Sequence, residues 1–161
     1  MDEERWALLE KRLAALEARV ADAEHPDRRE EFWALRALKE RAEGRSQVLF
    51  AGAVTLPDGR RYEWQEGVEV EPMLDADLTG AVAALSALAH PVRLQLVHKV
   101  LHGRRTVPEL AEGLGTSGQL YHHLRQLVAE GWLATSGRGV YEVPAVRVVP
   151  LLTLLAAAGL R

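Results

Sequence analysis

The chain has 161 residues, of which 48% are hydrophobic, with a formal net charge of -3 and no cysteine. This length suits one domain, or one small domain with attached segments. The lack of cysteine excludes disulfides, thiolate metal sites and thiol nucleophiles.

The charge is distributed unevenly along the chain. Residues 1–74 carry 12 basic and 17 acidic residues, whereas residues 75–161 carry 8 and 6. Such an asymmetry predicts two modules with different partners. The small basic excess of the second half is compatible with nucleic-acid binding but does not indicate it alone. The acidic start has no apolar signal-peptide core, and the longest apolar run, 148–160, is shorter than the ~20 residues of a membrane span. We therefore expect a cytoplasmic protein that does not enter a membrane.

The first predicted element is a helix over 2–24. Its apolar residues alternate in steps of three and four, which is the a/d seam of a coiled coil. These seam residues are Trp6, Leu9, Leu13, Leu16 and Val20. An amphipathic helix lying on its own domain would show a similar pattern over so short a run. The spacing favours a coiled-coil arm that forms a dimer.

His25-Pro26 breaks this helix, because proline disfavours helical backbone at the preceding residue. Asp27 and Glu30 then have the spacing of a capping box, which predicts a second helix to about Glu43. Gly44 is a suitable C-terminal stop.

From Gln47 to about residue 74 the apolar residues alternate with period two, as in half-buried strands. The turn sequence Leu56-Pro57-Asp58-Gly59 separates the first strand from the second. A second turn at Gln65-Glu66-Gly67 predicts a third strand at residues 68–70. Such a small β-meander needs helices or a second subunit to cover its apolar face.

The remainder predicts helices followed by a hairpin. Asp75 or Asp77 caps the first helix, and His90-Pro91 starts the next, which continues to Gly103. Two capping sequences follow, at Thr106 with Glu109 and at Thr116 with Gln119. They open two short helices that are separated only by residues 113–115. This spacing is typical of a helix-turn-helix.

A strand, a glycine-rich tip and a second strand follow over 132–143, and an apolar helix closes the chain over 146–160. A hairpin directly after such a helix pair is the wing of a winged helix. The expected fold is therefore mainly α with small β elements (α+β). Its predicted parts are an N-terminal arm over 1–45, a β-meander over 46–74 and a winged helix-turn-helix domain over 75–161.

The helix over 116–130 contains the run Tyr121-His122-His123. At about 100° per residue, the apolar side chains form one core stripe, which comprises Leu120, Leu124, Leu127 and Val128. His122 then points almost opposite this stripe, together with Gly118, Gln119, Arg125, Gln126 and Ala129. His123 lies at the border, where we expect it to pack against the preceding helix. The two histidines therefore do not face one metal ion.

His98 and His102 are four residues apart, which is the spacing of a helical metal pair. A solvated helix face is the favoured explanation of the pair, because zinc needs more ligands than two. A symmetric dimer could supply the others. The chain contains no phosphate loop, nucleophile elbow or other catalytic signature. We therefore expect neither an enzyme nor a bound cofactor.

Several of these motifs occur together in one known family. The segments "ALAHPVRLQL", "TVPELAEGLG", "HHLRQLVAEGWL" and "GRGVYEV" appear in the order found in ArsR-type winged helix-turn-helix transcriptional regulators. The chain resembles that family over about residues 78–143. The final apolar helix suits its C-terminal dimerisation helix, whereas the arm and the meander lie outside the resemblance.

The resemblance implies a homodimer on double-stranded DNA, with the helix over 116–130 in the major groove and the wing over 132–143 on flanking DNA. Ser117, Gln119 and His122 would approach base edges. Tyr121, Arg125 and Arg138 would contact phosphates, with Arg104 and Arg105 as weaker candidates. Three features differ from, or complicate, the family pattern, namely Tyr121 where a small hydroxyl residue is common, the loosening Gly118, and capping by Gln119.

The resemblance predicts a sequence-specific DNA-binding transcriptional regulator. Two alternatives stay open at this point. One is a protein-interaction module whose winged helix no longer reads DNA, and the other is a regulator that binds metal through His98 and His102. An unidentified small-molecule or protein effector is compatible with each of them.

Overall fold

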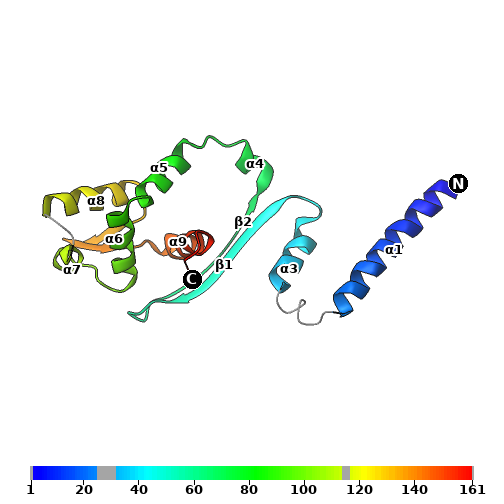
Figure 1. Ribbon diagram of the computed structural model, residues 1–161, viewed down its shortest axis with the longest axis horizontal. Helices are drawn as coiled ribbons and strands as arrows, with labels where there is room; N and C mark the ends of the chain where they lie inside the picture. Colours follow the sequence, from blue (N-terminus) through cyan, green and yellow to red (C-terminus); the bar gives the residue numbers. More distant parts are fainter. Residues whose placement is uncertain (1, 25–31, 114–116, 161) are drawn as a thin grey trace. The chain divides into compact units, whose positions relative to one another are not determined.

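The computed structural model describes residues 2–24, 32–113 and 117–160. The chain divides into two compact units, Met1–Gln47 and Val48–Arg161. The fold is mixed α+β, and its strands form two two-stranded sheets among the described residues (Figure 1).

The described part of the first unit contains two helices. Helix α1 spans Asp2–Glu24, as the sequence predicts, and α3 spans Trp33–Ala42. The predicted start of the second helix at Asp27 and Glu30 lies outside the described residues. Helix α3 ends before Glu43 and Gly44, which both have a positive φ, of 50° and 86°. Glycine adopts this conformation without steric cost, so the stop predicted at Gly44 is confirmed.

A β-hairpin opens the second unit. Its strands are β1, Gln47–Thr55, and β2, Arg61–Glu69. The turn between them is closed by the Leu56 N–H, which donates to the Arg60 carbonyl at 2.9 Å, and by the Gly59 N–H, which donates to the Leu56 carbonyl at 2.9 Å. Gly59 has a φ of +83°, which explains why glycine suits the last position of this turn.

The predicted second turn and third strand of the β-meander are wrong. Strand β2 continues through Gln65-Glu66-Gly67, and the chain from Val70 to Leu74 forms the short helix α4. Gly67 is not among the positive-φ glycines of the described residues. Both strands are nine residues long, so a turn at residues 65–67 would leave much of β1 without a partner.

The rest of the second unit follows the predicted order of elements. Its helices and strands are α5 Thr79–Leu88, α6 Pro91–Leu101, α7 Val107–Ala111, α8 Ser117–Ala129, β3 Ala134–Gly137, β4 Val140–Glu142 and α9 Ala145–Ala157. Strands β3 and β4 pair antiparallel, with Ala134 opposite Glu142 and Thr135 opposite Tyr141.

The starts of α5, α6 and α7 use the predicted caps, whereas the cap predicted for α8 at Thr116 lies outside the described residues. The Asp77 carboxylate accepts the Thr79 backbone N–H at 3.0 Å ahead of α5, and its pKa is lowered by this bond. His90 caps α6, because its Nδ1 accepts the Val92 N–H at 3.2 Å. At α7 the Glu109 carboxylate accepts the Thr106 N–H at 2.8 Å, as expected for the capping box. These bonds satisfy donors that a helix start leaves free.

One hydrophobic core joins the helices of the second unit to its two hairpins. It includes residues from α6, α7, α8 and α9, and also Leu56 from the first hairpin. Strand β1 approaches α9 closely, since a Cβ on Gly52 would lie 2.8 Å from Cγ1 of Val149. The β1–β2 hairpin therefore belongs to the same packed unit as the helices.

No single helix among the described residues is long and apolar enough to cross a membrane. Helices α5 and α6 meet the length and composition criteria only as a pair, and that pair is bent by 79°.

Candidate nucleic-acid interface

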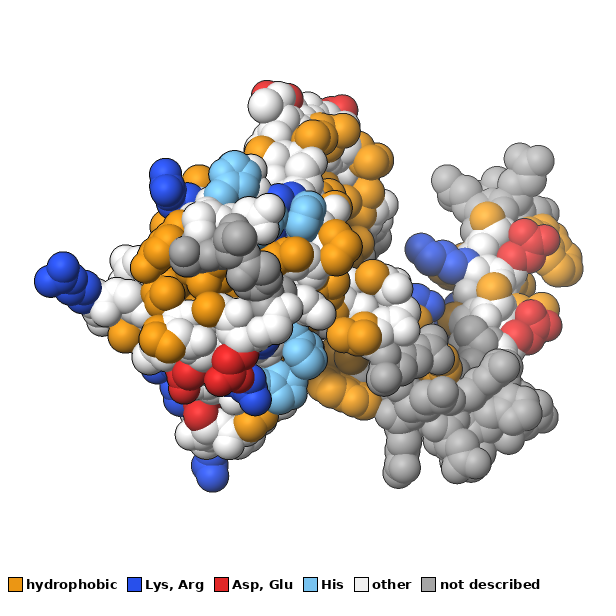
Figure 2. All heavy atoms as spheres, turned by 60° about the vertical axis from the view of Figure 1, so that its left-hand side comes forward, with side chains coloured by type: hydrophobic (Ala, Val, Ile, Leu, Met, Phe, Trp, Pro, Cys, Tyr) orange, Lys and Arg blue, Asp and Glu red, His pale blue; other side chains and the backbone are white. Residues whose placement is uncertain are grey.

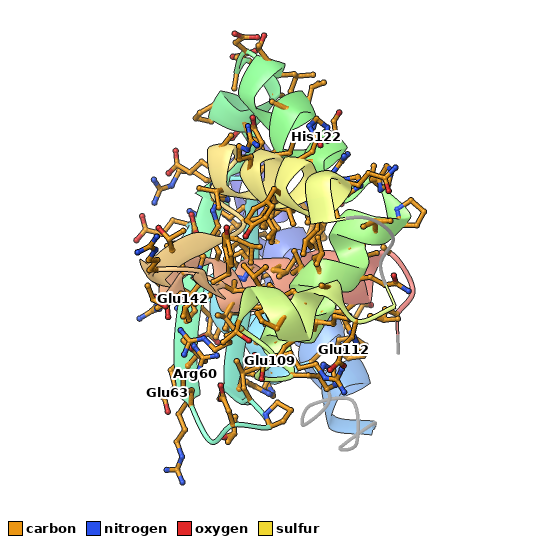
Figure 3. All side chains as sticks on the ribbon, turned by 90° about the vertical axis from the view of Figure 1, so that its left-hand side faces the viewer. Arg60, Glu63, Glu109, Glu112, His122 and Glu142 are labelled. Atoms are coloured by element: carbon orange, nitrogen blue, oxygen red, sulfur yellow. The ribbon has the colours of Figure 1, made fainter. Side chains whose placement is uncertain are left out.

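Helix α8 has one buried face and one exposed face. Leu120, Leu124 and Leu127 are at most 2% exposed and anchor the helix in the core, as predicted. Gln119, Tyr121, His122 and Arg125 are exposed on other sides of the helix, with Tyr121 at 43%. Figure 3 shows His122 on the far side of α8 from Glu109 and Glu112, which lie at α7.

The exposed side chains of α8 are available to a partner. Gln119, His122 and Arg125 make no hydrogen bond or ion pair with any residue that the structure describes. Together with the Tyr121 hydroxyl they offer amide, imidazole and guanidinium groups, which can donate hydrogen bonds to phosphate oxygens or base edges. The side chain of Ser117, the other predicted contact in this helix, lies outside the described residues.

The two adjacent histidines differ in environment. His122 is exposed, whereas His123 is half-buried and its ring lies 4.7 Å from that of His90. Burial lowers the pKa of His123, and the neighbouring His90, Arg93 and His122 lower it further. Its Nδ1 is buried without a hydrogen-bond partner among the described residues. The predicted packing against α7 is therefore wrong, because His123 packs against the start of α6.

Gln126 is also placed differently from the prediction, which put it on the outward face. It is half-buried, and its Oε1 accepts a hydrogen bond from Nη1 of Arg93 at 2.6 Å. The same guanidinium donates from Nη2 to the Ser86 carbonyl at 2.8 Å and from Nε to the Ala87 carbonyl. Arg93 thus holds the C-terminal end of α5 and the middle of α8 against α6. No local sequence pattern predicts this contact, which joins residues 33 positions apart.

A hollow beside this contact is lined by Arg93, Gln126 and Glu130 among others, and its volume is about 200 Å³. Ligand sites for small molecules and cofactors usually enclose ~300–1,000 Å³. The hollow is therefore small for a cofactor.

The β3–β4 hairpin is fixed to the start of α7. The Val107 N–H donates to the Gly139 carbonyl at 3.1 Å, and the Tyr141 N–H donates to the Arg105 carbonyl at 2.9 Å. Arg138 is exposed at the hairpin tip, as a phosphate contact would require. Backbone hydrogen bonds thus hold the β3–β4 hairpin against the start of α7. The sequence did not predict this arrangement.

Arg104 and Arg105 are engaged within the chain. Arg104 forms an exposed ion pair with Glu112 at 2.7 Å. Arg105 is half-buried, pairs with Glu142, and donates to the Ser136 hydroxyl at 3.1 Å. Its guanidinium holds the second hairpin in place, so Arg105 is not a free phosphate contact as the sequence suggested.

Basic side chains do not gather into one patch on the face drawn in Figure 2. There Lys and Arg side chains are dispersed among hydrophobic and acidic ones. This agrees with the small basic excess of residues 75–161. Any contact with nucleic acid on this side would depend on individual side chains rather than on a broad positive field.

His98 and His102 lie together on α6 and just after it. Their ring centroids are 4.3 Å apart, and Nδ1 of His102 lies 2.9 Å from the His98 carbonyl oxygen. Within the described ranges, no three His, Asp or Glu side chains are grouped so that they could hold a metal ion. The pair would need ligands from elsewhere, as expected from the sequence.

Comparison with protein-family models and with curated protein sequences finds no match for this chain. The arguments for its function therefore rest on its own residues and on their arrangement around α8.

Proposed function

We propose that this protein is a sequence-specific DNA-binding transcriptional regulator that acts as a homodimer. Its fold is a winged helix-turn-helix in which α8 enters the major groove and the β3–β4 hairpin is the wing on flanking DNA. The observation that carries the proposal is the outward face of α8. Gln119, His122 and Arg125 are exposed there without a described intramolecular partner, on a helix whose other face is anchored by buried leucines.

The roles of these side chains follow from their chemistry. Ser117, Gln119 and His122 are at the N-terminal half of α8, which is the part of a recognition helix that reaches base edges. A glutamine amide can pair with both N6 and N7 of adenine. Arg125 and Tyr121 contact phosphates on either side, and Arg138 does so from the wing. The hydrogen bonds between residues 105–107 and the wing keep these contacts in register.

Few cations take part, so binding depends moderately on salt. Arg125 and Arg138 supply two phosphate contacts in each subunit and hence about four in a dimer. Each phosphate neutralised by a cation contributes about -0.9 to the slope of log K against log salt, which predicts a slope of roughly -3.6.

The test is a titration of the protein onto fluorescent random and genomic duplexes at low salt, where phosphate contacts are strongest. We expect binding to both, with genomic footprinting then revealing a preferred site. Arg125→Ala should weaken binding without loss of folded structure, whereas Arg61→Ala, an exposed arginine on β2, is the matched control and should not. Lack of binding at low salt would refute the proposal.

A second candidate function is a protein-interaction module. The observation that favours it is a set of exposed apolar side chains on and around α4 and α5, in which Leu74 is 74%, Leu78 63% and Val82 59% exposed. Contiguous apolar patches on a protein surface commonly mark sites of protein–protein contact. A bound partner that is retained after combined substitution of Ser117, His122 and Arg125 would favour this candidate over DNA binding.

A further inference from the structure

Helix α1 exposes a row of large apolar side chains. Trp6 is 67%, Leu9 52%, Leu13 58% and Leu16 52% exposed. Every side chain described between residues 6 and 17 is exposed, so the described residues of the first unit do not cover this seam. Burial of apolar surface is the main favourable term in helix association. Burial of the seam against a partner helix would therefore stabilise the complex.

The seam has a heptad register that also orders the charges beside it. With Trp6 and Leu13 at a positions and Leu9 and Leu16 at d positions, Arg12 occupies a g position. Glu10 and Glu17 then occupy e positions. The sequence repeats this order in the neighbouring heptads, where Arg5 and Arg19 fall at g, Glu24 at e and Val20 at a. All three g positions of α1 are thus arginine, and all four e positions, which include Glu3, are glutamate.

This order distinguishes between the two orientations of a helix pair. In a parallel coiled coil, a g residue faces the e residue five positions later on the other helix, so Arg12 would face Glu17 of a second copy. In an antiparallel pair, g faces g and e faces e. Arginine would then face arginine and glutamate would face glutamate, which is destabilising for both rows.

We propose that α1 binds the α1 helix of a second copy of this chain as a parallel two-stranded coiled coil. A second copy is the partner because each helix carries both halves of the charge pattern and the same apolar seam. The proposal takes the homodimer from the proposed function and assigns it a surface and an orientation. It requires nothing of DNA binding.

The first experiment uses single cysteines in the full-length chain, which has none of its own. In a parallel pair, equal positions of the seam are neighbours, so Leu9→Cys and Leu16→Cys should each give disulfide-linked dimers on oxidation. Lys11→Cys at an f position on the outer side is the matched control and should give no disulfide-linked dimer under the same conditions. Cross-linking only in a mixture of Leu13→Cys and Leu16→Cys would indicate antiparallel helices, in which a positions face d positions, and would overturn the proposal, as would no cross-linking at any seam position.

The second experiment reverses the charges beside the seam. Arg12→Glu places two like-charged pairs in the dimer and should raise its dissociation constant by about five- to thirtyfold in sedimentation equilibrium at low salt. Adding Glu17→Arg restores opposite charges and should recover most of the loss. An unchanged dissociation constant for Arg12→Glu would overturn the proposal. Both measurements are made without DNA, so their failure leaves the DNA-binding titration as an independent test.

Discussion

Removing the guanidinium of Arg93 should weaken the packing of α8 against α5 and α6. Arg93→Met keeps the length of the aliphatic stem and removes the guanidinium that bonds to Ser86, Ala87 and Gln126. A hydrogen bond to a charged group contributes about 1.5–3 kcal/mol when buried. One of the three bonds is exposed and the other two are partly buried. Discounting them for solvent gives a loss of about 2–3 kcal/mol in the free energy of unfolding.

The contact with Gln126 can be isolated by a double-mutant cycle. Arg93→Met, Gln126→Met and the double variant would be unfolded in urea and followed by circular dichroism, with the urea dependence required to stay constant. We expect a coupling free energy of about 1 kcal/mol, because the bond between the two side chains is only partly buried. A coupling below about 0.3 kcal/mol would refute the reasoning, since independent sites add within that margin.

Three further predictions concern packing and protonation in the second unit. Gly52→Ala should lower the free energy of unfolding by about 1–3 kcal/mol, because the new Cβ would lie 2.8 Å from the buried side chain of Val149. Gly67→Ala, whose Cβ would have its nearest neighbour at 3.9 Å, is its control and should be neutral or stabilising. Leu124→Ala, at a position 1% exposed, should cost about 2–5 kcal/mol in thermal or urea unfolding. Because the pKa of His123 is lowered in the folded chain, the unfolded chain binds its proton first, so stability should fall as pH drops below about 6.5. His123→Leu should reduce this slope between pH 7.5 and 5.5, and an unchanged slope would contradict the assignment.

The helix starts could be predicted because their signals are local. His90-Pro91 and Thr106 with Glu109 each place a side-chain acceptor within a few residues of the N–H groups that it satisfies. The burial of Leu120, Leu124 and Leu127 followed from helical spacing alone. The prediction of a third strand was wrong because the turn-forming residues at 65–67 also fit within a strand. Pairing with the long strand β1 keeps β2 extended through these residues.

The surroundings of α8 could be predicted only in part. The exposure of His122 follows from its angle to the core stripe. The prediction that Gln126 points outward was wrong because its side chain bonds to Arg93, which is distant in sequence. Arg105 was misjudged in the same way, since its partner Glu142 is 37 positions away. Helical spacing gives the direction of a side chain, whereas its partners depend on tertiary contacts.

The contact between Gly52 and Val149 also bears on how the chain is made. The β1–β2 hairpin is synthesised well before α9, against which it packs, because Gly52 precedes Val149 by 97 positions. Contacts so distant in sequence close a long loop before they contribute stability. The apolar face of the hairpin therefore stays uncovered until α9 has been synthesised. A fragment that starts at residue 75 would lack β1 and leave that side of α9 exposed to water, so residues 75–161 do not contain the whole of their own hydrophobic core.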